Sequence, residues 1–116
     1  MLFKENRLRK KKDFERVLKN KQSRALAVSF LAVRFLPNNL DVSRIGFVVS
    51  KKISNKAVQR NKAKRRLRES VRIMTKSIRP GFDIVVFTRK GILQSDFAEI
   101  KKTIETLFKR SGLTTL

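Results

Sequence analysis

Residues 50–72 read SKKISNKAVQRNKAKRRLRESVR and carry ten Lys or Arg against a single acid, Glu69. So many like charges in one segment repel one another, and a polyanion relieves that repulsion. Nucleic acid is the commonest partner of such a segment. The segment also has internal order, because a lysine pair and an Asn-containing turn precede a patterned helix. It therefore predicts a basic helix that faces nucleic acid.

The helix is predicted to run from about Lys56 to Ile78, with Ser54-Asn55 as its candidate cap. Its second half has apolar side chains at steps of four, three and four residues, the spacing of one buried stripe: Leu67, Val71, Met74 and Ile78. Pro80-Gly81 ends it.

Two strands are predicted before this helix. Residues 26–36 are rich in Val and Phe and are expected to alternate between two faces. One face carries Leu31, Val33 and Phe35, and the other carries Phe30, Ala32 and Arg34. A turn signal, Pro37-Asn38-Asn39, leads to a second strand over residues 42–50, and so short a connection suggests an antiparallel pair.

A third strand and a last helix follow the basic helix. Residues 82–88, FDIVVFT, are apolar enough to form a central strand. Gln94 or Ser95 precedes the last helix, and Gly112 is its expected C-terminal stop. The core face of this helix is predicted to consist of Phe97, Ile100, Ile104, Leu107 and Phe108.

The segment before the first strand divides in two. Residues 1–12 are basic and almost without apolar periodicity, so an extended or weakly ordered arm is expected. Asp13 is a candidate N-cap for a short amphipathic helix that ends near Asn20. Its apolar residues recur at helical spacing: Phe14, Val17 and Leu18.

The predicted order is helix, strand, strand, long helix, strand and helix, within a single nucleic-acid-binding domain of residues 1–116. This order favours an α+β fold, a two-layer α/β sandwich whose sheet is covered mainly on one face. The other face is then at least partly open to a ligand.

Composition narrows the class of function. The formal charge is +21, and no apolar run is long enough to span a membrane or to form a signal peptide, so a cytoplasmic protein is expected. Cysteine and histidine are both absent, which removes the commonest zinc ligands and the commonest general base. The nine acids are scattered, so we expect the protein alone to bind no metal or cofactor. A self-contained nuclease is disfavoured, although acids distant in sequence can meet in a fold.

On a helical wheel the cations of the basic helix separate into groups. Asn61, Arg65, Arg68 and Arg72 share a narrow arc a quarter turn from the apolar stripe, whereas Lys62 and Arg66 project from the far side. Arg60 and Lys64 lie near the azimuth of the stripe at the N-terminal end, where they could face a groove beside the core. An ordinary solvated face is disfavoured, because acids do not interleave with these cations.

The motifs of this segment resemble those of the bacterial ribonuclease P protein subunit. That family has S-K-K, then A-V-x-R-N-R-x-K-R, then R-E, and this chain has Ser50-Lys51-Lys52, residues 57–65 and Arg68-Glu69. Similar matches to N-R-L, D-F-x-x-V, R-[IV]-G and D-x-[VI] extend the resemblance over nearly the whole chain: Asn6-Arg7-Leu8, residues 13–17, Arg44-Ile45-Gly46 and residues 83–85. Lys62 stands where the family most often has Arg, and Ala32 lies near a position often occupied by an aromatic.

The resemblance implies a fold of four strands and three helices with a left-handed βαβ crossover. Because right-handed crossovers are the rule, this hand does not follow from the sequence pattern. The pattern also predicts only three strands. A split within residues 26–50, or a short piece near residues 90–93, would supply the fourth.

The resemblance further implies a protein cofactor of a catalytic RNA, which uses Mg²⁺ to remove the 5′ leader of precursor tRNA. Docking on ribonuclease P RNA would involve Lys51, Lys52, Arg60, Asn61, Lys62, Lys64, Arg65 and Arg68. The single-stranded leader would lie in a groove formed by Phe14, Val17, Phe30, Arg34 and Ser50. No stable protein partner is expected.

Other interpretations remain open at the level of sequence. Phe14 and Val17 also fit an ordinary core, and Lys51 and Lys52 also fit a strand end in solvent. A ribosomal protein would explain the charge and would sediment with ribosomal subunits. An autonomous RNA-cleaving enzyme would act without an RNA cofactor. A DNA-binding module would prefer duplex DNA at matched salt.

Overall fold

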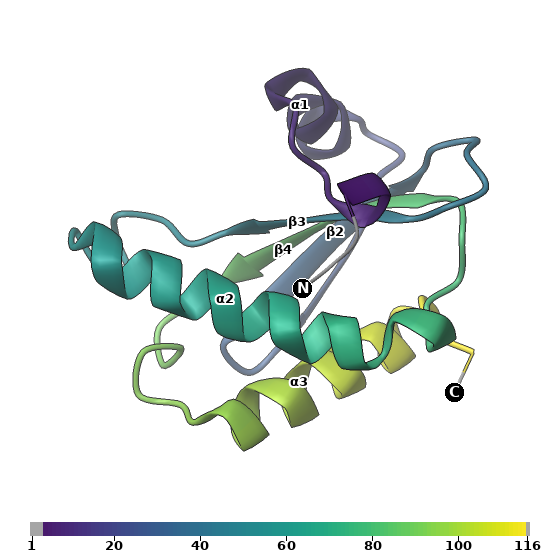
Figure 1. Ribbon diagram of the computed structural model, residues 1–116. Coiled ribbons are helices and arrows are strands. Elements are labelled where there is room, and N and C mark those ends of the chain that lie inside the picture. The colour runs from purple at the N-terminus through teal and green to yellow at the C-terminus, as the bar shows by residue number, and fades with distance from the viewer. Residues whose placement is uncertain (1–3, 116) are drawn as a thin grey trace.

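A four-stranded mixed sheet organises residues 4–115, the part of the chain that the computed structural model describes (Figure 1). Its strands, in spatial order, are β1 (Arg24–Val28), β2 (Leu31–Pro37), β4 (Phe82–Thr88) and β3 (Arg44–Val48). The helices are α1 (Lys11–Lys19), α2 (Ala57–Ile73) and α3 (Phe97–Arg110), with short 3₁₀ helices η1 (Lys4–Asn6) and η2 (Thr75–Ser77). Helices α2 and α3 cover one face of the sheet and α1 lies on the other, which confirms the predicted α+β class (Figure 1).

The fourth strand comes from a split in the segment predicted as one strand. β1 and β2 form an antiparallel hairpin across Ser29 and Phe30, and Ser29 has a φ of 53°. A non-glycine residue in this left-handed region is uncommon, and the segment carries no Gly, Pro or Asn that would signal a turn. The apolar pattern of this segment therefore gave no indication of the turn.

The predicted antiparallel pairing of the second and third strands, β2 and β3, is wrong. β4 lies between them, antiparallel to β2 and parallel to β3, so that β3, α2 and β4 form a crossover unit. The reason is burial: Ile84, Val85 and Val86 are fully buried, and a strand apolar on both faces takes a central position. The hand of the crossover stays a prediction from the family resemblance.

The larger core lies between the sheet and helices α2 and α3. The predicted apolar faces of β2 and of both helices meet there, with Leu31, Leu67, Val71 and Phe108 fully buried. The exception is Phe97, which was predicted for the core face of α3 and is half-buried outside this core. α2 ends at Ile73, earlier than predicted, because Met74 leaves helical geometry and η2 follows.

The helix ends also differ in detail from the predictions. The N-cap of α2 is Lys56, whose own N–H donates to Ser54 Oγ at 3.1 Å. The N-cap of α3 is Asp96, one residue later than predicted, and its carboxylate accepts from the Glu99 N–H at 2.8 Å. Gly112, with a φ of 74°, follows the end of α3 as predicted.

The N-terminal arm is more ordered than predicted over residues 4–10; residues 1–3 lie outside the described residues. Arg7 forms a parallel bridge with Ile45 on the free edge of β3, and the Leu8 N–H donates to the Ile45 carbonyl at 3.0 Å. Leu8 is buried in a smaller core beneath α1. The arm therefore covers an edge that would otherwise expose unpaired backbone groups.

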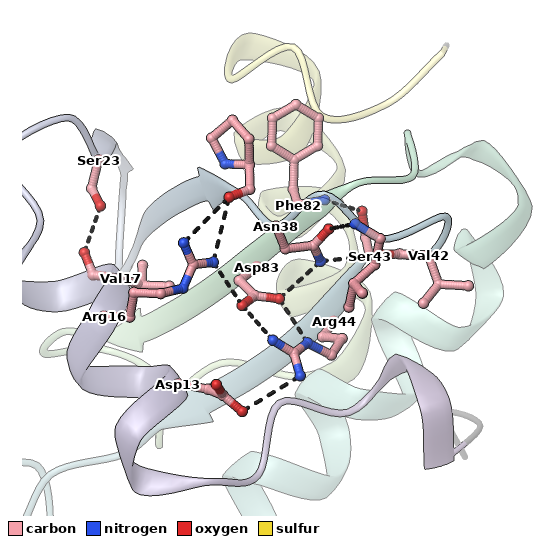
Figure 2. Close-up of polar contacts among 12 residues, drawn as sticks. Asp13, Arg16, Val17, Ser23, Asn38, Val42, Ser43, Arg44, Phe82 and Asp83 are labelled. Carbon is pink, nitrogen blue, oxygen red and sulfur yellow. Dashed lines mark hydrogen bonds and ion pairs between the residues drawn. The ribbon is translucent and has the colours of Figure 1, made fainter.

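A buried carboxylate fastens α1 to the sheet (Figure 2). The Asp83 side chain has no exposed surface and accepts hydrogen bonds from Arg44 Nε at 2.8 Å, Arg44 Nη2 at 2.7 Å, Asn38 Nδ2 at 2.9 Å and Arg16 Nη2 at 3.0 Å. We call these four residues the Asp83 cluster. Asp13, predicted to be an N-cap, instead lies within the first turn of α1, where its carboxylate is 3.4 Å from Arg44 Nη1.

The cluster shifts the pKa of Asp83 and that of Arg44. Burial by itself raises the pKa of Asp83, but the hydrogen bonds from Arg44, Asn38 and Arg16 outweigh it and hold that pKa below its usual range. The hydrogen bond to Asp83 in turn raises the pKa of Arg44. The carboxylate is therefore ionised in the folded protein throughout the neutral range.

We expect Asp83→Asn to lower the free energy of unfolding by about 3 kcal/mol, since Arg44 and Arg16 lose the fully buried carboxylate that accepts their hydrogen bonds. The folded pKa of Asp83 lies below the unfolded value of roughly 3.9, so its stabilisation is complete above that pH and is lost as the pH falls toward the folded pKa. Urea titrations at pH 7 and at about pH 3 should show the two proteins converging in stability at the lower pH. Asp41→Asn, at an exposed acid, is the control, and an equal effect of both substitutions would contradict the role of Asp83.

Candidate nucleic-acid interface

Helix α1 covers only part of its face of the sheet. Arg34, Val85 and Gly46 are register partners in one row across β2, β4 and β3. The Phe14 ring rests on Gly46, so closely that a methyl group added at Gly46 would overlap Phe14 Cζ. Val17 and Val85 are fully buried in the smaller core. Val17 was predicted to line the leader groove; that prediction is wrong, because it has no surface left for a ligand.

The next row on this face of the sheet is only partly covered, because Val48 and Phe87 pack against the smaller core and keep some exposed surface. Ala32, Phe87 and Val48 are register partners, all half-buried, and Ala27 beside them is exposed. We call these four residues the sheet floor. Phe87 was not among the predicted site residues, although the alternation in FDIVVFT puts it on the same face as Asp83 and Val85. Phe87 lies opposite Ala32 on β2. The sheet floor therefore has an aromatic side chain next to the position near which the family often has an aromatic residue and this chain has Ala.

Arg34 and Phe30, two other residues predicted to line the groove, lie on opposite sides of the sheet. Arg34 lies on the same face as the sheet floor, half-buried, and its Nε has no hydrogen-bond partner within residues 4–115. Phe30 sits in the β1–β2 turn and packs into the larger core on the opposite side of the sheet. The prediction that Phe30 lines the groove is therefore wrong. It assumed one continuous strand, in which Phe30 and Ala32 share a face, but the turn at residues 29–30 interrupts that strand and places Phe30 on the other side of the sheet.

A basic pocket of about 250 Å³ lies between the N-terminal arm, the edge of β3 and α2. Its cations are Arg7 and Arg9 from the arm and Lys64 and Arg68 from α2, and its apolar wall includes Phe14 and Phe47. We call it the arm pocket. Lys64 was expected to face a groove beside the core, and it does. No carboxylate of residues 4–115 forms an ion pair with any of the four cations, so their charge is available to an anion.

The outer surface of α2 carries further predicted residues. Asn61 and Arg65 are exposed on the crest of the helix, whereas Arg60 is half-buried and its Nη1 donates to the Ser54 carbonyl at 2.9 Å. Lys62 lies on the far flank of α2, away from the arm pocket. The turn after β3 exposes Lys51 and Lys52 at the helix's N-terminal end. Ser50, which was predicted for the leader groove, is exposed in the same turn. The predicted docking residues therefore lie on both flanks and on the crest of α2 and in the turn before it, rather than on one face of the helix.

Farther along α2, Arg72 pairs with Glu69 at 2.5 Å. Their hydrogen bond lowers the pKa of Glu69 and raises that of Arg72. The other cations of α2 form no ion pair with a carboxylate of residues 4–115. The helix therefore presents its positive charge largely uncompensated toward its N-terminal half.

The carboxylates that do meet in the fold are occupied by arginine. Asp13 and Asp83 both contact Arg44. Within residues 4–115 there is no group of three Asp, Glu, His or Cys side chains placed to hold a metal ion. In the same range, every helix is too short or too polar to cross a membrane.

The comparisons with known proteins agree with this geometry. The family model described as "Ribonuclease P" matches residues 2–112. The chain belongs to the ribonuclease P protein family. It is 40% identical over 107 residues to the ribonuclease P protein component of Caldanaerobacter subterraneus subsp. tengcongensis, covering 92% of this chain and 90% of that protein.

Solved structures of the family share the fold. The Staphylococcus aureus RNase P protein aligns with a TM-score of 0.84 at 30% identity, covering 95% of this chain and 98% of that one. The Thermotoga maritima RNase P protein aligns with a TM-score of 0.80 at 38% identity, covering 90% and 96%. As a member of this family, the chain is a protein component of ribonuclease P, an endoribonuclease complex of tRNA processing.

The contact between Phe14 and Gly46 gives a test of how α1 is seated in this ribonuclease P protein. Gly46→Ala should displace the Phe14 ring and destabilise the fold by about 1–3 kcal/mol through overpacking. Phe14→Leu should recover part of that loss in the double variant, because the smaller side chain makes room for the methyl group. Thermal unfolding of the two single variants and the double variant measures the coupling, and strict additivity would contradict the contact.

Proposed function

We propose that the protein docks on the catalytic RNA of ribonuclease P through the basic surface of α2 and holds the 5′ leader of precursor tRNA on the sheet floor beside α1. In this proposal the RNA subunit, with Mg²⁺, hydrolyses the phosphodiester bond that joins the leader to the tRNA. The protein acts in the cytoplasm with these two RNAs as its partners. One observation carries the proposal: uncompensated cations of α2 line a pocket together with Phe14, and the sheet face on which Phe14 lies also carries a second half-buried aromatic side chain, Phe87.

Phosphate contact by α2 is supported by its charge and by its exposure. Arg65 and Asn61 are exposed on the crest, and Lys51 and Lys52 extend the same charge beyond the N-terminal end of the helix. Arginine offers a planar fork of donors to a phosphate, and the first turn of a helix adds free N–H groups. A positively charged surface of this kind recognises the sugar–phosphate backbone of a folded RNA.

A single strand suits the sheet floor better than a duplex does. Phe87 and Phe14 are both half-buried, so each keeps part of its ring accessible while its backbone stays fixed. An unpaired base can stack on such a ring, and stacking is tolerant of sequence. Arg34 lies in the neighbouring row and can meet the phosphates of the same strand.

The assignment of the chemistry to RNA agrees with the side chains of the protein. A hydrolytic site needs a base or a metal-binding group of carboxylates. The protein contains no histidine, and Asp83 and Asp13 are both engaged by Arg44. Mg²⁺ therefore belongs with the RNA subunit in this proposal. An autonomous RNA-cleaving enzyme is disfavoured on the same grounds.

Cleavage of precursor tRNA at low Mg²⁺ tests the proposal directly. A bacterial ribonuclease P RNA is assayed with and without the protein, beside a control that contains protein alone. Stimulation that requires the RNA and increases with leader length is the expected result. Cleavage by the protein alone, or no stimulation at all, would overturn the proposal.

Arg65→Ala should weaken binding to ribonuclease P RNA and reduce the slope of log affinity against log salt by about one, since one phosphate contact is removed. Arg65 is exposed, so thermal unfolding should be unchanged. Filter binding at several salt concentrations provides the measurement. Lys102→Ala on α3 removes a charge of the same sign and serves as the control; equal losses would refute a docking surface on α2.

Phe87→Ala should weaken binding of precursor tRNA with a leader to the holoenzyme by about 5- to 150-fold, which corresponds to loss of one stacked base. Binding of leaderless tRNA should not change. Ile73→Ala truncates another exposed apolar side chain, on α2, and is the control. If both tRNAs lose affinity equally, the sheet floor does not hold the leader.

A further inference from the structure

The two edges of the sheet differ in how their backbone is covered. The β3 edge is paired with the N-terminal arm through the bridge between Arg7 and Ile45. The opposite edge is β1, which pairs with β2 alone. Within residues 4–115, the backbone of β1 has no hydrogen-bond partner apart from β2. Its outer side therefore presents unpaired donors and acceptors, as a free edge strand does.

The β1–β2 turn determines which backbone groups point outward. Only residues 29–30 separate the two strands. In a two-residue hairpin the residue next to the turn, here Val28, bonds to the partner strand, and so does every second residue before it. The alternate residues are Ala25 and Ala27. Their N–H and C=O groups point away from the sheet and can bond to one further strand.

Residues 24–28, all of which the structure describes, lack the features that usually protect a free edge. Such edges commonly contain a bulge, a proline or a lysine in the middle of the strand. Here the register with β2 is regular, and the one charged side chain, Arg24, stands at the first position. Ala25 and Ala27 are small and exposed, so another backbone can approach them. The edge is suited to strand addition.

The two faces of β1 determine which side chains an added strand needs. Leu26 and Val28 are half-buried and pack against the larger core, on the side of α3. An antiparallel strand places every second side chain beside them, where an apolar group gains contact. On the opposite face the neighbours are Ala25 and Ala27, and Arg34 pairs with Ala25 across the hairpin.

The charge around this edge is positive. Arg34 is half-buried and its Nε has no hydrogen-bond partner within residues 4–115. A residue added beside Ala25 lies two strand spacings, about 10 Å, from Arg34, which an arginine and a glutamate side chain together can span. Arg24 is exposed and pairs with no carboxylate of the described residues. A second copy of the chain would bring a further charge of +21 to this edge, so an acidic strand fits it better.

We propose that the free edge of β1 binds an extended segment of a second protein, in which apolar and acidic side chains alternate, as an antiparallel fifth strand. Its backbone bonds to Ala25 and Ala27, its apolar side chains pack beside Leu26 and Val28, and its acids face Arg34. A contact with so short a strand is weak and reversible, in keeping with the expectation of no stable protein partner. The inference goes beyond the proposed function and does not depend on it, because no RNA takes part in the contact.

The test uses a fluorescent peptide of alternating glutamate and valine, long enough to span β1, and measures its binding to the full-length protein by anisotropy. The paired probe carries N-methyl groups on the glutamate nitrogens, which face β1 in this arrangement, so it loses donors and keeps its charge. The unmethylated peptide should bind about tenfold more tightly or better, since two backbone hydrogen bonds distinguish the probes. Equal affinities would mean that charge alone attracts the peptide, and the inference would be overturned.

Ala27→Pro tests the same contact from the side of the protein. Proline removes only the outward N–H, and edge strands accept proline at such a position. Ala57→Pro is the matched control, because Ala57 is exposed at the first position of α2 and follows an extended Lys56. Ala27→Pro should weaken peptide binding about threefold to tenfold relative to this control, and equal affinities would contradict the proposal. Thermal unfolding accompanies each variant, and the methylated peptide decides the outcome if Ala27→Pro does not fold.

Two further measurements distinguish other occupants of the edge. A peptide of alternating lysine and valine that binds wild-type protein as tightly as the glutamate peptide would refute the acidic partner. Sedimentation equilibrium that detects a dimer of the wild-type protein, abolished by Ala27→Pro, would assign the edge to a second copy and overturn the proposal. None of these experiments contains RNA, so their failure is separate from any failure of the proposed function.

Discussion

The Asp83 carboxylate joins four parts of the chain that are distant in sequence. Asp83 is the second residue of the central strand β4, its side chain is fully buried, and it accepts hydrogen bonds from Arg44 on β3, Arg16 on α1 and Asn38 in the β2–β3 connection. A buried charge without partners would destabilise the fold by several kcal/mol, so these groups must all be in place together. The cluster consequently fixes the position of α1 on the sheet. A carboxylate that could have served chemistry is instead part of the framework.

The position of α1 decides which part of the sheet remains open. Phe14 rests on Gly46, and Val17 closes the smaller core over Val85. Helix α1 covers the row that contains Gly46 and Val85, whereas the next row, with Phe87 at its centre, keeps accessible surface. A small displacement of α1 along the strands would bury this row and expose apolar core, which is why the same contacts that stabilise the fold also define the candidate leader site.

The charge of the protein is distributed around α2 by the helical period. The apolar stripe with Leu67 and Val71 anchors one side of the helix, and the cations that cannot be buried occupy the remaining surface. They reach the arm pocket on one flank, the crest of the helix, and on the other flank a hollow lined by Lys62 and Arg66. With a formal net charge of +21, the isolated chain folds against its own repulsion, so a bound RNA should stabilise it by mass action.

Helical spacing and charge density are properties of a short segment. For that reason α2 with its cations, α3 and the central strand β4 could be predicted from local patterns. Local patterns predicted the wrong face of the sheet for Phe30 and a place in the groove for Val17. The β1–β2 turn contains no Gly or Pro to indicate it, and the packing of α1 on the sheet cannot be read from a short segment. Which distant side chains meet depends on how the strands are ordered in the sheet: β4 inserts between β2 and β3 and brings Asp83 beside Arg44. Each strand takes its neighbours by the burial of both its faces, and that burial depends on the whole chain at once.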